Sequence, residues 1–540
     1  MNGISAALNV LSIPGCIFWY GPLLVFTVIL HRIAAGSSLP RHPSFGDAAS
    51  FLISIWIYAL LLILTSRGAF ACLLAALLIM ALYIANAAKK KALREEPLVI
   101  TDLALGWQVI RFPGLYLPFL PCRMIVAGSV VFGGLGVLLW LLSETEDISW
   151  VWMVIAGLPP TLIVMLALAP RSVSAPLSRW LLTPFPLKFD ARQDAESFGP
   201  LGAAILHLTW HISNPLSPKP QCQGSTENSM PKSAAPDPVA PPVWGDSCRE
   251  LIARPPSPEK LPHIFLVQAE SFCDPRVFSG AVPRDILKNW DRLRSQGQSG
   301  AFRVRDFGAY TLRTEFAALT GLPPEALGTY AFYPYLAALR SPVWSLAYFL
   351  RELGYRTICM HPFHREFFFR HRAIPHLGFQ EFVTIESFPK RDTYGPYISD
   401  NSVAEAMTDI IRESSQPVFS FAITMESHGP WLPGRFKKEF PDGDAPKILG
   451  LSDPVCRYLA HVKNADAMMG MLAEGLSKAE RPGVMALYGD HLPNLPDLIT
   501  GGDTATPYIV WKTNGSPGGG VKKDIRPEEI GGAILSGGRE

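Results

Sequence analysis

The sequence has few of the features that mark several protein classes. Its eight cysteines form no Cys-x-x-Cys or other metal-binding spacing, which argues against a structural zinc site. Lysine and arginine (48) nearly balance aspartate and glutamate (46), and no long basic stripe with interleaved aromatic residues occurs, so we expect no nucleic-acid partner. The first apolar run lacks a preceding basic segment and is followed at once by further apolar runs. We therefore expect no cleavable signal peptide.

Charged residues are also scarce, at 17%, whereas apolar residues make up 49% and the mean hydropathy is +0.20, a high value for a soluble protein. Five runs without Asp, Glu, Lys or Arg account for this bias: Ile13–Leu30, Ala49–Thr65, Ala69–Ala88, Met124–Leu142 and Ile148–Ala169. Each run is long enough, or nearly so, to cross a bilayer as a helix. The sequence thus predicts a five-helix transmembrane domain over residues 1–170.

The region 171–262 differs in composition from both of its neighbours. Phe198–Ile212 is apolar but short, and we interpret it as an interfacial helix. Asn214–Pro262 is dense in Pro, Ser and Lys, which is typical of an extended linker. Cys222 and Cys248 flank its Pro-rich part and could pair in an oxidising compartment. We predict a juxtamembrane segment that separates the membrane domain from a second domain, 263–540.

From His263 onward, short apolar runs alternate with amphipathic segments, a pattern typical of an α/β domain with a largely parallel sheet. In such sheets, ligands bind beyond the carboxyl ends of the strands. The expected strands are Ile264–Val267, Thr357–Met360, Val418–Thr424, Val484–Tyr488 and Tyr508–Trp511, and the expected helices are Arg284–Ser295, Leu312–Leu319, Trp344–Leu353 and Val455–Leu476.

Polar residues follow three of the predicted strands. Glu270 follows the first strand, and the Asp490-His491 pair follows the strand that ends at Tyr488. His428 follows the strand that ends near residue 424. Each residue alone could equally be a capping carboxylate or an ordinary loop histidine. Together, carboxylate and imidazole donors at neighbouring strand ends suit a divalent ion, Mn²⁺ or Mg²⁺.

Thr311 is the candidate nucleophile. It follows a glycine-containing turn and directly precedes the predicted helix Leu312–Leu319, where unpaired backbone N–H groups suit an anion such as phosphate. A divalent ion held by Glu270, Asp490 and His491 would lower the pKa of the threonine hydroxyl, which would be a further ligand. Thr314, one helical turn later, is the rival nucleophile.

These motifs resemble those of the lipoteichoic acid synthase and phosphoglycerol transferase family, membrane enzymes of the alkaline phosphatase and sulfatase superfamily. The matching stretches are Val267–Phe272, Thr311–Phe316, His361–Phe382, Glu426–Pro430 and Gly489–His491. The resemblance implies a sulfatase-like fold for the C-terminal domain and one manganese or magnesium ion held by Glu270, Thr311, Asp490 and His491. It also implies that Thr311 takes glycerol phosphate from phosphatidylglycerol as a covalent intermediate. Thr311 is preferred over Thr314 because it precedes a Glu-Phe pair by four residues, as the family's threonine does.

The stretch His361–Arg370 resembles the family segment that binds the glycerol phosphate headgroup. His361 and Arg370 keep the family's residue types, and an arginine can bind a phosphate as a fork. Phe368 stands where the family commonly has tryptophan, which keeps a ring but loses the indole N–H. By the same resemblance, we expect His428 to contact the substrate.

The resemblance also bears on orientation. The strongest basic cluster, Lys89-Lys90-Lys91 with Arg94, lies between the third and fourth apolar runs, and the positive-inside rule would place it and the C-terminal domain in the cytoplasm. The family instead implies a multi-pass protein of the inner membrane with its catalytic domain on the periplasmic side. In that orientation, Lys89–Lys91 could bind the phosphate of an anionic lipid.

The resulting prediction is a phosphoglycerol transferase that acts on an extracytoplasmic glycan or a glycerol phosphate polymer. A phosphoethanolamine transferase, a sulfatase or phosphodiesterase of the same fold, and a non-catalytic receptor for lipid headgroups are the alternatives. The sulfatase alternative is disfavoured because the Thr311 turn contains no Cys-x-Pro-x-Arg or Ser-x-Pro-x-Arg sequence. The receptor alternative is disfavoured because a sensor has no need of a nucleophile.

Overall fold

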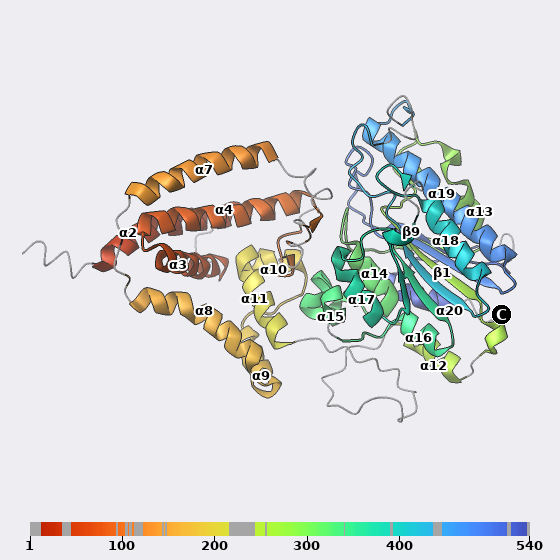
Figure 1. Cartoon of the computed structure of the whole chain (residues 1–540), viewed down its shortest axis with the longest axis horizontal. Helices are drawn as coiled ribbons and strands as arrows, with labels where there is room; N and C mark the ends of the chain where they lie inside the picture. The colour runs from red at the N-terminus through yellow and green to blue at the C-terminus, as the bar shows by residue number, and fades with distance from the viewer. Residues whose placement is uncertain are drawn as a thin grey trace, which may run out of the picture. The chain divides into compact units, whose positions relative to one another are not determined.

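The computed structural model of the chain forms two compact units, residues 1–215 and 216–540 (Figure 1). The residues that the structure describes are 12–34, 45–92, 96–102, 106, 108, 111–112, 122–142, 145, 148, 150–214, 243–253, 256–339, 341–388, 393–435, 445–515 and 520–536.

The first unit is helical. Each of the five predicted apolar runs overlaps one helix: α2 (Ser12–Ala34), α3 (Phe45–Thr65), α4 (Gly68–Ala92), α7 (Cys122–Leu142) and α8 (Trp150–Leu168). Two segments, Gly46–Thr65 and Gly68–Lys90, are long and apolar enough to cross a membrane, as judged by length and composition. Within the described residues, the apolar stretches of the other three helices are shorter. The helices are confirmed, and five membrane crossings remain a prediction.

Helices α2, α3 and α4 pack against one another, and α3 also packs against α8. Small residues such as Ala59, Ala71 and Ala75 are fully buried between them, which lets the backbones approach closely. Helices α9 (Arg171–Leu182), α10 (Ala191–Phe198) and α11 (Pro200–Ser213) complete the unit, and α11 packs against α3, α8 and α9. The predicted interfacial segment is therefore helical, and one of its faces is covered by other helices of this unit.

Lys89 is held by carboxylates. Its Nζ lies 2.7 Å from Oδ2 of Asp102 and 3.2 Å from Oε1 of Glu96, and its side chain is only 10% exposed. Since these acids neutralise Lys89, a lipid phosphate would have to displace them to bind it. Arg94 lies outside the described residues.

The second unit is built on an eight-stranded sheet with the order β10-β2-β9-β8-β1-β7-β3-β4. All neighbouring pairs are parallel except β2–β9 and β9–β8, which confirms the predicted largely parallel sheet. The strands are β1 (His263–Ala269), β2 (Gln298–Phe302), β3 (Arg356–Met360), β4 (Glu381–Val383), β7 (Val418–Ile423), β8 (Gly483–Gly489), β9 (Thr506–Lys512) and β10 (Val521–Lys522), with the separate hairpin β5 (Thr393–Tyr394) and β6 (Tyr397–Ile398).

Helices cover both faces of this sheet (Figure 1). Alternate residues of β1, such as Phe265 and Val267, join a core cluster with α13 (Lys288–Arg294), α18 (Asp400–Arg412) and α19 (Asp453–Lys478). Gln268 points to the other face, where it contacts Glu315 of α14 (Thr311–Thr320). The helices α16 (Leu346–Glu352), α17 (Arg370–His376) and α20 (Ile530–Ser536) belong to the same unit.

The C-terminal part of the predicted linker is folded onto the second unit. Helix α12 (Gly245–Ala253) lies beside α20, and Trp244 is only 2% exposed against Gly531. The N–H of Val243 also donates to the carbonyl of Gly321 at 2.9 Å. The Pro-rich composition did not reveal this packing because a single buried tryptophan provides it. Cys222 lies outside the described residues, so its pairing with Cys248 remains a prediction.

Candidate metal and nucleophile site

The register of the sheet brings the predicted metal ligands together. Ala269 of β1 pairs with Gly489 of the neighbouring strand β8, so Glu270 and Asp490 directly follow paired residues. The chain that follows β1 passes so close to the end of β8 that a Cβ on Gly489 would stand 2.0 Å from the carbonyl oxygen of Phe272. Only glycine fits this position.

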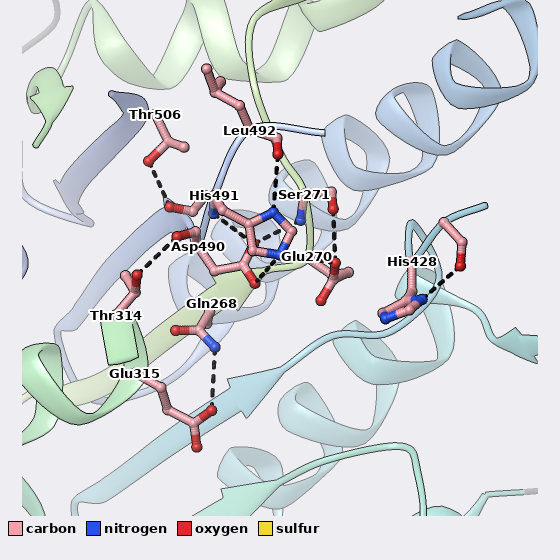
Figure 2. Close-up of polar contacts among 12 residues, drawn as sticks. Gln268, Glu270, Ser271, Thr314, Glu315, His428, Asp490, His491, Leu492 and Thr506 are labelled. Atoms are coloured by element: carbon pink, nitrogen blue, oxygen red, sulfur yellow. Dashed lines mark hydrogen bonds and ion pairs between the residues drawn. The ribbon is translucent and has the colours of Figure 1, made fainter. Parts of the chain in front are cut away.

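Glu270, Asp490 and His491 form one buried cluster. Their ligand atoms all lie within 4.8 Å of one another, and none of the three residues is more than 4% exposed. Nε2 of His491 lies 3.6 Å from Oε1 of Glu270 and 3.3 Å from Oδ2 of Asp490 (Figure 2). Residues far apart in the sequence thus meet at the carboxyl ends of two adjacent central strands.

Thr311 is the first residue of α14. Gly308 (φ 70°) and Tyr310 (φ 66°) are both left-handed, and the N–H of Gly308 donates to the carbonyl of Leu492, which ties this turn to the chain that follows His491. Arg313 braces the turn through Asp306 at 2.6 Å and through the ring of Tyr310. Arg313 is therefore neither an exposed helix residue nor an unpaired cation.

The two candidate threonines have different surroundings. The hydroxyl of Thr311 lies close enough to the Asp490 carboxylate to lower its pKa. The hydroxyl of Thr314 donates to the backbone carbonyl of Asp490 at 2.9 Å and is buried (Figure 2). Thr314 thus ties the helix to the Asp490-His491 turn, whereas Thr311 faces the cluster.

Burial and charge repulsion dominate the electrostatics of the cluster. Burial, followed by the nearby Glu270 carboxylate, raises the pKa of Asp490 to about 7. Burial also acts to lower the pKa of His491, but the facing carboxylates of Asp490 and Glu270 outweigh it, so that this pKa is raised. The raised pKa of Asp490 shows that negative charge is in excess inside the cluster.

The cluster fits a divalent ion. Oδ2 of Asp490 is buried and has no hydrogen-bond partner among the described residues. Carboxylate oxygens and one imidazole nitrogen are donors that Mn²⁺, Mg²⁺ and Zn²⁺ all accept. An ion at this position would bind this oxygen, which lies 3.3 Å from Nε2 of His491, and would balance the two carboxylates. Glu270, Asp490 and His491 would hold it, with Thr311 beside them.

The predicted headgroup residues form a second buried group. Arg370 is 1% exposed, and its NH2 and Nε nitrogens lie 2.7 and 3.3 Å from the carboxylate oxygens of Glu315. Its NH1 lies 3.1 Å from Nε2 of His361, whose Nδ1 bonds the carbonyl of Ile423. Burial and the Arg370 charge hold the pKa of His361 well below its usual value, so His361 is neutral and accepts from Arg370. Gln268 links this network to Tyr488.

Phe368 and His428 are more exposed than this network. The ring of Phe368 lies 5.2 Å from the Arg370 guanidinium and stacks on Phe367. Nδ1 of His428 lies 2.7 Å from the carbonyl of Gly429, which leaves Nε2 with the lone pair. Figure 2 shows His428 apart from the Glu270, Asp490 and His491 cluster.

A Ser-x-Pro-x-Arg sequence occurs elsewhere in the chain, at Ser387–Arg391. Ser387 follows the edge strand β4, which is three strand positions from β1 and hence roughly 15 Å from it across the sheet. Residues 389–392 lie outside the described residues. Among the described residues, the hydroxyl that meets the acidic cluster from a helix start is that of Thr311.

Several residues that support the site were not predicted. The hydroxyl of Thr424 accepts from the N–H of Glu270 at 3.0 Å, and that of Thr506 donates to the carbonyl of Gly489 at 2.6 Å. Glu426 accepts from His461 and Asn464 in a further buried polar group. Thr424 and Glu426 follow β7 and Thr506 begins β9, but nothing in their sequence context separates them from ordinary polar loop residues.

The fold and this site define an α/β domain in which a buried acidic cluster lies beside a threonine at a helix start. The chain belongs to the sulfatase family, whose model matches residues 262–536. This region runs from the residue before β1 to the end of α20, and it is a domain of the alkaline phosphatase and sulfatase superfamily. The predicted family is thereby confirmed at the level of the superfamily.

Individual relatives match part of the chain. The capsular polysaccharide biosynthesis protein RkpI of Rhizobium meliloti (strain 1021) is 39% identical over 245 residues, which are 44% of this chain and 42% of the relative. A putative cyclic beta-1,2-glucan modification protein of the same organism is 30% identical over 286 residues, 49% of this chain and 43% of the relative. The chain thus spans less than half the length of these curated relatives. The solved Streptococcus pyogenes phosphoglycerol transferase GacH, in complex with sn-glycerol-1-phosphate, is 20% identical with a TM-score of 0.45, covering 54% of this chain and 78% of that one.

Proposed function

We propose that the protein is a membrane-anchored, metal-dependent phosphoglycerol transferase. It moves glycerol phosphate from phosphatidylglycerol, by way of an ester on Thr311, to an extracytoplasmic glycan or glycerol phosphate polymer. The observation that carries the proposal is the position of Thr311 at a helix start, with its hydroxyl beside a buried acidic cluster that fits a divalent ion. A bound Mn²⁺ or Mg²⁺ would lower the pKa of the hydroxyl and offset negative charge on the phosphoryl oxygens.

In the first step, Oγ1 of Thr311 attacks the phosphorus of phosphatidylglycerol. The bond from Oγ1 to phosphorus forms, and the bond from phosphorus to the diacylglycerol oxygen breaks. The threonine proton passes to solvent, and diacylglycerol leaves with a proton that its oxygen takes from solvent. Backbone N–H groups in the first turn of α14 would lie near the phosphoryl oxygens and would stabilise the developing charge.

In the second step, a hydroxyl of the acceptor attacks the same phosphorus and frees Thr311, which recovers a proton. His428 is the base for this step, because its Nδ1 is occupied by the carbonyl of Gly429 and its Nε2 keeps the lone pair. Its position apart from the metal cluster suits contact with the acceptor.

The headgroup is recognised by the stretch His361–Arg370. Phe368 provides an accessible ring, and Arg370 lies directly behind it, held by Glu315 and His361. The pair of Glu315 and Arg370 carries no net charge, so the segment selects a headgroup by shape and hydrogen bonds as well as by charge. Glycerol, which is uncharged, suits such a pocket better than the cationic ethanolamine of the phosphoethanolamine alternative.

The helical unit anchors the enzyme in the inner membrane and brings it close to its lipid donor. The five apolar helices support this part of the proposal, together with the two segments long enough to cross a bilayer. We place the catalytic unit on the periplasmic side, where glycan acceptors are found. The names of two relatives, a capsular polysaccharide biosynthesis protein and a putative glucan modification protein, favour a glycan as the acceptor.

Mass spectrometry of the full-length protein tests this function. Protein incubated with phosphatidylglycerol and Mn²⁺, without an acceptor, should carry one glycerol phosphate group, and peptide mapping should locate it on Thr311. The variant T311A should carry none, and T314A should still be loaded. A phosphoethanolamine adduct from phosphatidylethanolamine would support the alternative transferase instead. If wild-type protein carries no adduct with either lipid, the transferase proposal is wrong.

A further inference from the structure

Ser271 joins the two carboxylates of the cluster. Its hydroxyl donates to Oε1 of Glu270 at 2.8 Å, and its backbone N–H donates to Oδ1 of Asp490, also at 2.8 Å (Figure 2). Its carbonyl accepts from the hydroxyl of Tyr458 at 2.8 Å. Ser271 is 2% exposed, so all three of its polar groups are used inside the protein.

The backbone of Ser271 has an unusual conformation. Its φ of 52° is left-handed, a region that residues other than glycine seldom adopt because Cβ crowds the backbone. Non-glycine residues keep such conformations where the surrounding structure fixes them, often at functional sites. Here the chain leaves β1, and its next two N–H groups have fixed partners. The N–H of Glu270 donates to the hydroxyl of Thr424, which follows β7, and the N–H of Ser271 donates to the carboxylate of Asp490, which follows β8.

This arrangement has a specific effect on the two acids. Two buried carboxylates at this distance repel each other, and repulsion would separate side chains that are free to rotate. Ser271 holds one oxygen of each by a charge-assisted hydrogen bond. The bond to Asp490 uses Oδ1, whereas Oδ2 has no hydrogen-bond partner among the described residues. The backbone N–H of His491 also donates to Oδ1, at 2.9 Å. Oδ2, which lies 3.3 Å from Nε2 of His491, is the Asp490 oxygen available to an ion.

We propose that Ser271 is a positioning residue that sets the affinity of the site for a divalent cation, an inference that rests on the proposed metal-dependent function. It contacts neither the ion nor the substrate. It fixes the spacing of Glu270 and Asp490 before the ion binds, so that binding requires no further ordering of these side chains. Outer-shell partners of this kind typically contribute a factor of about 10–100 in metal affinity.

Two variants separate this role from a purely structural one. S271A removes the hydroxyl and keeps the unfavourable backbone conformation, whereas S271G removes the hydroxyl and relieves the conformation. Mn²⁺ binding to full-length, detergent-solubilised protein is measured by electron paramagnetic resonance of the free ion, and folding by Tm after EDTA treatment. We expect both variants to bind Mn²⁺ about 10–100-fold more weakly than wild type. We expect S271G to keep the wild-type Tm, because glycine adopts a positive φ freely.

T506V is the matched control. Thr506 is buried at the start of β9 and donates to the carbonyl of Gly489, but it bonds neither carboxylate. We expect T506V to change Tm and to leave the Mn²⁺ affinity close to wild type. If T506V weakened Mn²⁺ binding as much as S271G does, general loosening of the site would explain both, and the role assigned to Ser271 would be wrong.

The remaining outcomes also decide the question. A folded S271G variant with wild-type Mn²⁺ affinity would overturn the inference, while the Thr311 adduct of the wild-type protein would leave the transferase function intact. If wild-type protein bound neither Mn²⁺, Mg²⁺ nor Zn²⁺, the metal site and the role of Ser271 would both be wrong. Should S271A fail to fold, S271G alone supplies the comparison.

Discussion

The catalytic unit contains two buried acid–histidine groups that meet the same helix, and they differ in charge balance. Glu270, Asp490 and His491 lie beside Thr311 with two carboxylates and no arginine or lysine in contact among the described residues. Four residues further along α14, Glu315 is paired with Arg370. Both groups are fully buried.

The difference shows how charge balance separates a binding site from an internal support. A buried acid paired with its own cation is complete, and its contacts hold secondary structure elements together. A buried acidic pair without a cation is incomplete, and an external ion can complete it. We infer that the first group takes the ion and that the second holds the nucleophile helix to the headgroup segment.

The largest effect is expected from D490N. Removing this ligand should weaken Mn²⁺ binding by more than about 100-fold, beyond the range for outer-shell partners, and should abolish the adduct on Thr311. D466N is the control, because Asp466 is also buried but accepts N–H groups at the start of α13, away from the cluster. D466N should lower Tm and leave Mn²⁺ binding unchanged. Equal Mn²⁺ affinities for D490N and wild type would remove the distinction between the two groups.

Breaking the buried pair of Glu315 and Arg370 should lower the stability of the protein and not its metal affinity. E315Q leaves the buried Arg370 without its charge partner, which typically costs roughly 3–5 kcal/mol. Its Tm should fall by several degrees, while Mn²⁺ affinity should change little. The control is E381Q, which breaks the more exposed pair of Glu381 with Arg356 on β4 and β3, worth about 1 kcal/mol or less. A stable E315Q variant that bound Mn²⁺ poorly would reverse the assignment.

The pH dependence of the metal-free protein sharpens the same comparison. The pKa of Asp490 is raised to about 7, so the folded state keeps a proton that the unfolded chain releases near pH 4. Stability should therefore fall as pH rises from about 4 to 7. The raised pKa of His491 acts in the same direction, since its contribution is present below pH 6.5 and is lost as pH rises through the folded pKa.

Tm measurements between pH 4.5 and 8 in EDTA check this expectation. D490N should show a shallower decline than wild type, because one of the two titrating groups is gone. Saturating Mn²⁺ should flatten or reverse the decline, because the ion binds the deprotonated ligands. A metal-free wild-type protein whose Tm rises steadily over this range would contradict the proposed charge imbalance.

The smallest effect is expected from F368W. The substitution adds an indole N–H next to Arg370, and one hydrogen bond to the headgroup should lower the KM for phosphatidylglycerol by about 2–10-fold. F369W is the control, since Phe369 is the next residue and shares its left-handed backbone, with φ of 58° compared with 55°. If both variants changed KM equally, the position of Phe368 would have no special role.

Much of the catalytic unit could be predicted from the sequence. The strands β1, β3, β7, β8 and β9 are apolar runs bounded by polar loops, and all five were expected. The strands β2 and β4 were missed because β2 carries Gln298, Ser299 and Gly300, and β4 has only three residues. Their pairing depends on neighbouring strands, which local composition does not reveal.

The site was predicted in part. Glu270, Asp490 and His491 stand at strand ends, and a parallel sheet gathers such residues, so their proximity followed from the pattern. The pairing of Arg370 with Glu315 did not, because it depends on how α17 and α14 pack. The contacts of Ser271 depend on its φ of 52°, and no local sequence signal for a serine predicts that value.

The bond from Thr314 to the carbonyl of Asp490 ties α14 to the turn that follows β8. A threonine ester at Thr311 would therefore be formed and cleaved at the same position relative to the Asp490-His491 turn. Between the two displacements, the departing lipid and the incoming alcohol have to change places around a stationary phosphorus atom.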